Sequence, residues 1–160
     1  MDINLGLKVS LQTPALLTSE PPSPIILPLT AFIQNENQYP ITIVKWNTPL
    51  DPNAGSLGIF HICDTTSGET LAADTIEISR KLPASQDDLV QIDGGQTIQY
   101  QHDLTGWNFQ KDHEYSIRAQ GTWHSLWNCP LADVTASQTQ TLTGDKRGQF
   151  RSEFVGFMVK

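Results

Sequence analysis

Residues 41–55 constrain the fold of this chain more than any other stretch. Ile41–Trp46 alternates β-branched side chains with others, which is the pattern of a β-strand. The alternation assigns Trp46 to one face of that strand, and we predict that it is a core residue. Pro49 lacks the N–H that a strand ladder needs, and Asp51–Gly55 consists of turn-forming residues. A strand that carries an inward Trp and ends in a proline-containing turn indicates a small β-sandwich.

The same two-residue alternation recurs along the chain, and no helix-period segment exceeds about two turns. The expected strands are residues 5–11, 25–34, 41–46, 57–63, 76–81, 89–92, 96–104, 114–121 and 149–160. We expect the second and third of these to form a hairpin, and residues 132–148 to form a polar surface excursion. The pattern predicts one all-β domain over residues 1–160. It would be an antiparallel, two-sheet, immunoglobulin-like sandwich of roughly seven to nine strands.

Charge and hydropathy exclude several classes of partner. The formal net charge is −7, and the Lys and Arg residues are scattered, which argues against nucleic acid and anionic membrane surfaces. No apolar stretch approaches the roughly 20 residues of a membrane span. Residues 1–30 do not read as a secretory signal, because prolines and Lys8 interrupt the apolar runs. We therefore expect a cytoplasmic protein, with secretion after signal removal as the alternative.

Metal and acid–base chemistry have weak support in the sequence. His61 and Cys63 lie two residues apart on one face of an expected strand, but two ligands do not make a site. The alternative is a surface His beside a thiol. Asp87 and Asp88 adjoin turns and are expected to be solvated. Cys63 and Cys129 permit one disulfide or two separate thiols. We predict no cofactor, no metal and no catalytic residue.

Three tryptophans lie near loops in the second half of the chain. Trp123 and Trp127 either cap the end of the sandwich or form a recognition surface, since large aromatic side chains with few charges around them are typical of such surfaces. Trp107 precedes the strand 114–121 that leads to them, so we place it at the opposite end. We take Trp123 and Trp127 as the candidate binding residues.

The run Val44–Asp51, followed closely by Ile59-Phe60, resembles the non-catalytic N-terminal domain of deuterolysin-like zinc endopeptidases, the aspzincin family that includes the peptidyl-Lys metalloendopeptidases. A Tyr-x-Ile-Arg strand at Tyr115–Arg118 and a closing Glu153-Phe154 pair agree with it. The motif residues are Lys45, Trp46, Asn47, Thr48, Pro49, Leu50 and Asp51. The resemblance implies a β-sandwich that assists folding of a protease and holds it inactive. The chain has no His-Glu-x-x-His pair, so the resemblance does not extend to peptidase activity.

Together these features predict a non-enzymatic, protein-binding module. Its partner would be a protein, with a deuterolysin-like zinc endopeptidase as the version that the resemblance implies. One alternative is a structural sandwich that forms a homodimer through its exposed sheet edges. The other is a small metal-dependent enzyme that uses His61 and Cys63.

Overall fold

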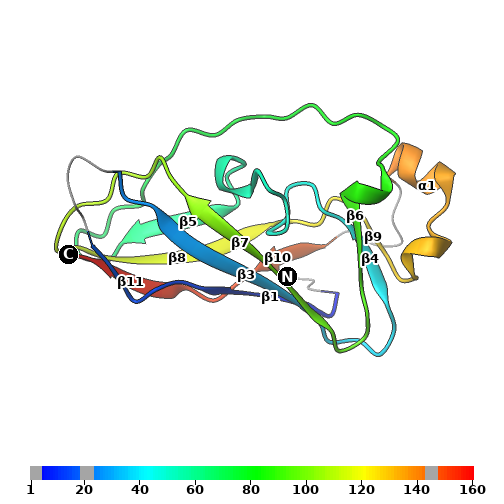
Figure 1. The fold of residues 1–160 in the computed structure, drawn as a ribbon, viewed down its shortest axis with the longest axis horizontal. Coiled ribbons are helices and arrows are strands. Elements are labelled where there is room, and N and C mark those ends of the chain that lie inside the picture. Colours follow the sequence, from blue (N-terminus) through cyan, green and yellow to red (C-terminus); the bar gives the residue numbers. More distant parts are fainter. Residues whose placement is uncertain (1–4, 19–23, 143–147) are drawn as a thin grey trace.

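The computed structural model describes residues 5–18, 24–142 and 148–160, and strands dominate the described chain (Figure 1). The first sheet has the order β1-β3-β7 and contains β1 (Leu7–Gln12), β3 (Leu27–Asn35) and β7 (Thr97–Leu104). In the second sheet β8 pairs with β5, β10 and β11, and β11 also pairs with β2. These strands are β2 (Leu16–Leu17), β5 (Phe60–Asp64), β8 (Glu114–Thr122), β10 (Gln149–Arg151) and β11 (Val155–Val159). The β11–β2 pair is parallel and the others are antiparallel. The predicted all-β sandwich is confirmed.

A third, smaller sheet closes one end of the molecule. It has the order β6-β4-β9 and contains β4 (Ile41–Val44), β6 (Leu89–Ile92) and β9 (Leu126–Trp127). All four residues of β4 are buried, because β4 is the central strand of this sheet. The predicted hairpin between the second and third strands is wrong, since β3 and β4 follow each other in sequence but lie in different sheets.

The side chain of Asn35 explains why the chain leaves the first sheet after β3. Asn35 is fully buried, and its amide donates hydrogen bonds to the carbonyls of Tyr39 (2.8 Å) and Ile92 (2.9 Å). Its Oδ1 accepts from the backbone N–H of Asn37 at 2.9 Å. These bonds fix a bend over residues 35–39, so the chain enters the small sheet beside β6 and does not return along β3.

Two hydrophobic clusters fill the interior. The larger one joins the facing sheets, with residues such as Leu29 and Ile33 from β3 against Ile117 from β8. The smaller one lies at the end closed by the small sheet and includes Trp46 and Trp127. The prediction that Trp46 belongs to the core is confirmed, because its side chain is only 5% exposed.

Residues 72–83, here called the strap, cross the top of the molecule in Figure 1 between β5 and the 3-10 helix η2 (Gln86–Asp88). The predicted strand at 76–81 is wrong, since the strap contains no strand. Its backbone bonds the body through Ile76 N–H, which donates to the Ser56 carbonyl at 2.8 Å. Ile76 remains 52% exposed. An alternating pattern does not make a strand where no neighbouring strand completes the ladder.

The predicted closing strand 149–160 is split into β10 and β11 by a bulge. Arg151 pairs with Gln120, whereas Val155 pairs with Ile117, so the β10–β11 segment holds one residue more than the stretch of β8 opposite it. The hydroxyl of Ser152 accepts the N–H of Ala119 at 2.8 Å and satisfies the ladder there. Because of this extra residue, Phe150 and Phe157 both face the core despite their unlike parity.

Short helices occupy the described part of the polar excursion predicted at 132–148. They are η3 (Leu131–Asp133) and α1 (Ala136–Thr141), and residues 143–147 lie outside the described residues. Thr135 caps α1 by accepting the N–H of Gln138 at 3.2 Å. The short pieces β2, β9 and β10 raise the described strands to eleven, above the predicted number.

Candidate binding groove

The motif 45–51 folds into a tight turn that its own polar side chains close. Asn47 adopts a left-handed backbone with φ of 58°, which Asn tolerates better than most residues. The Thr48 hydroxyl donates to the Lys45 carbonyl at 2.7 Å. Asp51, 1% exposed, accepts the N–H groups of Asn47 and Asn53, each at 2.9 Å. The motif therefore has a structural role within this chain, which is to build one rigid wall.

Arg80 ties the strap to this wall. Its Nη2 lies 2.7 Å from Oδ2 of Asp51 and 3.3 Å from Oδ1 of Asn47. Its guanidinium carbon lies 5.4 Å from the centre of the Trp46 ring, within the range of a cation–π contact. Three kinds of contact thus hold one side chain against the motif.

Asp88 completes the same wall from η2. Burial raises the pKa of Asp88, but hydrogen bonds from Ser85 and from the Trp46 side chain outweigh it, so the pKa lies below its ordinary value. The Ser85 N–H and hydroxyl both lie 2.9 Å from Asp88 Oδ2. Asp88 is half-buried, and its carboxylate caps η2. Asp87 next to it is exposed, as predicted.

Two adjoining cavities separate this wall from β7. The larger, of about 460 Å³, has an apolar floor of Trp46, Val90 and Ile98. The smaller, of about 230 Å³, is lined by six consecutive residues, 100–105. Both cavities are lined by Tyr100 from β7 and by 52–53 from the opposite wall, so they adjoin each other. We call the two cavities together the β7 groove.

The consecutive lining shows how the groove is oriented. Side chains of neighbouring strand residues point to opposite faces of a sheet, so a cavity over one face would be lined by every second residue. Residues 100–105 all line the smaller cavity. The groove therefore runs along the edge of β7, where the backbone is accessible.

A hydrogen bond joins the two sides of the groove at its base. His102 is buried, and its Nε2 lies 2.6 Å from the carbonyl oxygen of Pro49, so this nitrogen carries the proton. Burial lowers the pKa of His102 below 6.5, although the Pro49 carbonyl and the charges of Asp51 and Asp103 act in the opposite direction. A neutral imidazole is the form that fits this position.

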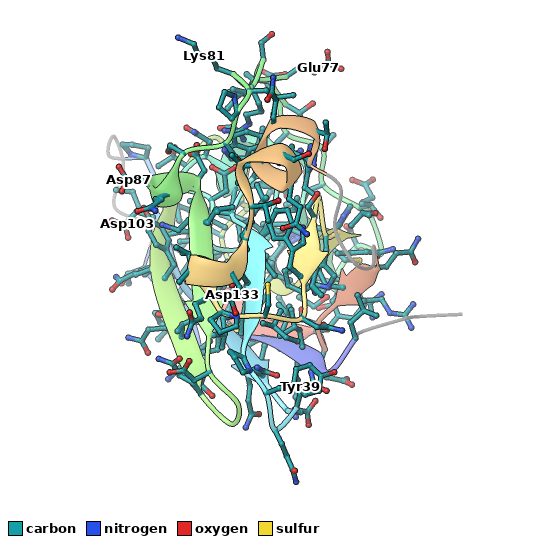
Figure 2. The ribbon with its side chains drawn as sticks, turned by 90° about the vertical axis from the view of Figure 1, so that its right-hand side faces the viewer. Tyr39, Glu77, Lys81, Asp87, Asp103 and Asp133 are labelled. Atoms are coloured by element: carbon teal, nitrogen blue, oxygen red, sulfur yellow. The ribbon has the colours of Figure 1, made fainter. Side chains whose placement is uncertain are left out.

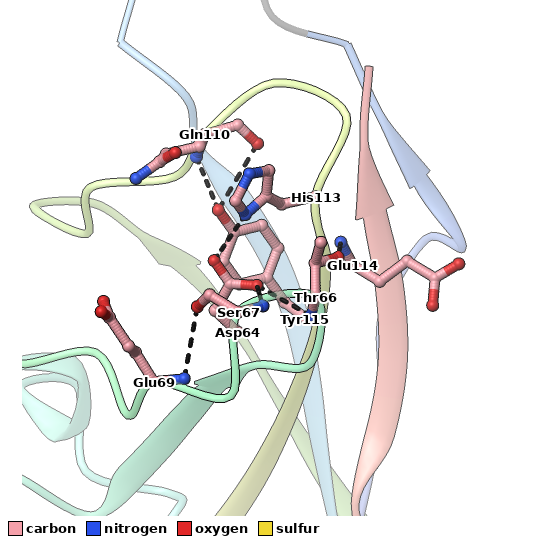
Figure 3. Close-up of polar contacts among 8 residues, drawn as sticks. All are labelled: Asp64, Thr66, Ser67, Glu69, Gln110, His113, Glu114 and Tyr115. Carbon is pink, nitrogen blue, oxygen red and sulfur yellow. Dashed lines mark hydrogen bonds and ion pairs between the residues drawn. The ribbon is translucent and has the colours of Figure 1, made fainter.

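A second polar cluster lies at the end of β5 (Figure 3). Asp64 Oδ2 lies 2.6 Å from His113 Nδ1, and Oδ1 accepts the N–H groups of Thr66 and Ser67 at 2.9 and 3.0 Å. Burial raises the pKa of Asp64, but the bonds from His113 and Ser67 prevail and lower it. Ser67 Oγ accepts the N–H of Glu69. These contacts give the Asp64–His113 pair a turn-closing role.

A family model described as an immunoglobulin-like domain matches residues 6–159. The chain belongs to the immunoglobulin-like domain family. An uncharacterized secreted protein of Arthroderma benhamiae is 34% identical to this chain over 131 residues, which are 79% of this chain and 66% of that protein. The chain thus spans just under two thirds of that relative's length. Neither comparison links the domain to zinc endopeptidases, and neither supports the expected cytoplasmic location.

The structure corrects the expectation that Trp123 and Trp127 form an exposed recognition surface. Both side chains are fully buried. Trp123 packs on Phe150 with ring centres 4.8 Å apart, and Trp127 belongs to the smaller cluster. The physical reason is that β8 and β9 turn inward here to close the immunoglobulin-like domain, so aromatic bulk fills its end. Trp123 also lines an inner face of a cavity of about 420 Å³ beside His124.

His61 and Cys63 project from β5 next to β8, opposite Arg118 and Ser116. Among the described residues of the immunoglobulin-like domain, no group of three or more His, Cys, Asp or Glu could hold a metal ion. Cys63 and Cys129 are separate thiols, which resolves the choice that the sequence left open. Within the same residues, no helix is long and apolar enough to cross a membrane.

Tyr100, Asp103 and Arg80 are groove residues that sequence reasoning missed. Tyr100 alternates with the polar residues Gln99 and Gln101, and its side chain is 36% exposed. A usable signal was present in Gln99, Gln101 and Asp103, since a strand that is polar on one face is typical of an exposed position. Arg80 could not be linked to Asp51 from sequence, because no regular element joins them.

Proposed function

We propose that this immunoglobulin-like domain is a non-enzymatic binding module that holds a protein partner in the β7 groove. The observation that carries the proposal is the lining of the groove by consecutive residues of an edge strand, 98–104 of β7. Ligand sites in proteins are concave, with an apolar floor and a few placed polar groups. The Trp46 floor, the ion pair Arg80–Asp51 and Asp103 fit that description.

We further propose that the domain works outside the cell. The supporting observation is that a relative 34% identical over most of the chain is named a secreted protein. Detection of the protein in the culture medium of its source cells, with a cytosolic marker retained in the cells, is the expected result. Retention of both in the cells would contradict it.

A zinc endopeptidase stays one partner to test. Its support is the run 45–51, which this chain uses to build the groove wall around Asp51. We expect the purified domain to form a complex with such a protease and to lower its rate. An unchanged rate together with no complex would remove this version and leave the general proposal standing.

The general proposal is tested by affinity capture with matched variants. The immobilised domain is exposed to culture medium, and bound proteins are identified by mass spectrometry for wild type, Tyr100→Ala and Tyr39→Ala. Tyr39 is the control because it is 45% exposed but lines none of the groove. We expect a partner that is lost with Tyr100→Ala and retained with Tyr39→Ala. A partner retained by both variants would place the binding surface elsewhere, and no partner at all would contradict the proposal.

A further inference from the structure

The backbone edge of β7 that faces the groove has unpaired hydrogen-bonding groups. In the described structure β7 has a strand neighbour on one side only, which is β3. The N–H of Asn35 donates to the Gln96 carbonyl at 2.9 Å, one step beyond the Gln34–Thr97 pair that ends the register. Bonded and non-bonded pairs alternate in an antiparallel ladder. The backbone groups of 98, 100 and 102 therefore face β3, and those of 97, 99, 101 and 103 face away.

The position of Pro28 supports this assignment of which β7 backbone groups face β3. Pro28 has no N–H, and it lies opposite Asp103 in the register. By the alternation above, this pair is one in which ladder bonds between the two strands are absent. A proline fits there without loss of a hydrogen bond. The open edge of β7 thus offers the N–H and C=O of Gln99, Gln101 and Asp103 to the groove.

Edge strands in soluble proteins are normally protected by proline, lysine, a bulge or a short length. β7 has eight residues, Thr97–Leu104, with no proline, no lysine and a single charge, Asp103. Its register with β3 is unbroken from Leu27 to Gln34. Residues 52, 53, 55 and 56 line the smaller cavity together with 100–105, so this cavity lies beside the strand. These are the features of strands that accept an added peptide strand.

The charges beside the groove indicate the chemistry of the added strand. Asp87 and Asp103 are exposed, form no ion pair among the described residues, and lie on the same side of the molecule in Figure 2. Asp51 and Asp88 also line the groove, against two basic side chains, Lys45 and Arg80. Arg80 is already paired. A cationic segment is therefore complementary, and the half-buried side chains of Val90 and Ile98 offer an apolar contact.

We propose that the β7 groove binds an extended peptide segment as an added strand, with an apolar side chain over Val90 and Ile98 and a Lys or Arg beside Asp103. The inference rests on the proposed binding function and names its ligand class. Seven residues of such a segment span about 23 Å, the length of the β7 stretch 98–104 that lines the groove. Residues of the segment two apart would point to the same side.

A displayed library of random linear nonapeptides identifies the ligand, followed by affinity measurement with a selected synthetic peptide. We expect enrichment of sequences with one Lys or Arg near an apolar residue. We also expect slower amide hydrogen exchange at 99 and 101 when the peptide is bound. Enrichment of acidic peptides, or no enrichment over an empty support, would overturn the inference.

Two variants of one residue separate strand addition from side-chain contact. Gln101→Pro removes an outward N–H without removing a ladder bond to β3, and Gln101→Ala keeps that N–H. We expect affinity to fall at least tenfold with Gln101→Pro and to change less than twofold with Gln101→Ala. Equal affinities would overturn the inference. If Gln101→Pro unfolds, two peptides replace it as the test, one methylated on its odd-numbered amide nitrogens and one on its even-numbered ones. Only one of the two peptides should lose binding, because only every second amide of an added strand faces β7.

Matched changes in the protein and the peptide test whether Asp103 pairs with the basic residue of the peptide. Asp103→Asn should weaken binding of the selected peptide about five- to tenfold at low salt. It should not weaken binding of the same peptide with norleucine in place of the basic residue. Equal loss for both peptides would overturn the role of Asp103. A protein partner that depends on Tyr100 while no peptide binds would contradict strand addition and leave the proposed function intact. A concentration-dependent dimer that Gln101→Pro abolishes, without peptide binding, would instead identify a second copy of this chain as the occupant.

Discussion

The guanidinium Nη2 of Arg80 lies 2.7 Å from the carboxylate Oδ2 of Asp51, and this pair attaches the strap to the groove wall. The two residues come from segments that share no regular hydrogen-bonded ladder. Asp51 is almost fully buried while Arg80 reaches solvent, so the loss of Arg80 would leave a buried carboxylate with only its two backbone donors.

Arg80→Ala should therefore lower the free energy of unfolding by about 1–3 kcal/mol, the usual cost of leaving a buried polar group under-satisfied. Urea unfolding at neutral pH measures it. The control is Lys81→Ala, an exposed neighbour, which should change stability by less than about 0.5 kcal/mol. Equal effects of the two variants would show that the pair does not anchor the strap.

Lowering the pH below 6.5 should destabilise the protein through His102. Its pKa is depressed by burial in the folded state, so the unfolded state binds more protons between 6.5 and the folded pKa. Stability is then greatest above 6.5 and declines as pH falls through that window. His102→Gln should flatten this part of the profile. Two-dimensional NMR of the imidazole provides the direct check, and titration at or above 6.5 would contradict the expectation.

The Asp64 carboxylate should stabilise the protein in a different pH range. Its folded pKa lies below the ordinary value of 3.8, so its contribution is present above 3.8 and is lost as pH falls through the folded pKa. Wild type should be more stable than Asp64→Asn at pH 5, and the difference should shrink towards pH 2.5. Melting temperatures across this range measure the effect. A difference that does not depend on pH would show that charge is irrelevant at this turn.

Trp127→Ala should lower the free energy of unfolding by about 3–5 kcal/mol, as expected for a large buried side chain. Trp127 packs in the smaller cluster with Val44 and Leu89 and lines neither part of the groove. Affinity for a groove ligand should therefore stay within about twofold at a temperature where the variant is folded. Tyr39→Ala is the surface control. A loss of affinity in a folded Trp127→Ala protein would show that this end of the sandwich contributes to binding.

Period-two patterning correctly predicted most strands, because burial on one face leaves a direct trace in sequence. β1, β3, β7 and β8 follow their predicted ranges closely. Trp46 was placed in the core for the same reason. The pattern failed in the strap, where Ile76 and Ile78 alternate correctly but no strand among the described residues pairs with them. Alternation reports which side chains favour burial and carries no information on whether a partner strand is available.

The sequence pattern predicted less well which strands pair with each other. The side-chain pattern of 25–34 and 41–46 suits a hairpin, but the buried hydrogen bonds of Asn35 fix a bend that leads the chain into another sheet. The bulge at Ser152 was invisible for a similar reason, since one hydroxyl bond to Ala119 decides it. In both places a single polar side chain fixes the path of the chain through hydrogen bonds to residues that are distant in sequence.

The candidate site was predicted in part. The run 45–51 stands out in the sequence and forms a wall of the groove. The sequence indicates a family motif there but does not show that Asp51 closes a turn. The tryptophans 123 and 127 drew attention through their size, yet size alone does not distinguish an anchor from core. The open edge of β7 arises from sheet order, which no local pattern encodes.

The small sheet at the end of the sandwich has a consequence for how the protein is made. Its central strand β4 pairs with β9, where Thr42 lies opposite Trp127, more than half the chain length away. Pairings between such distant segments have a high loop-closure cost and slow folding. During synthesis the nascent chain cannot complete this sheet, or bury Trp46 against its cluster, until β9 has left the ribosome. Until then Ile41–Val44 can pair with β6 along one edge only, and its other edge is open to pairing with other chains.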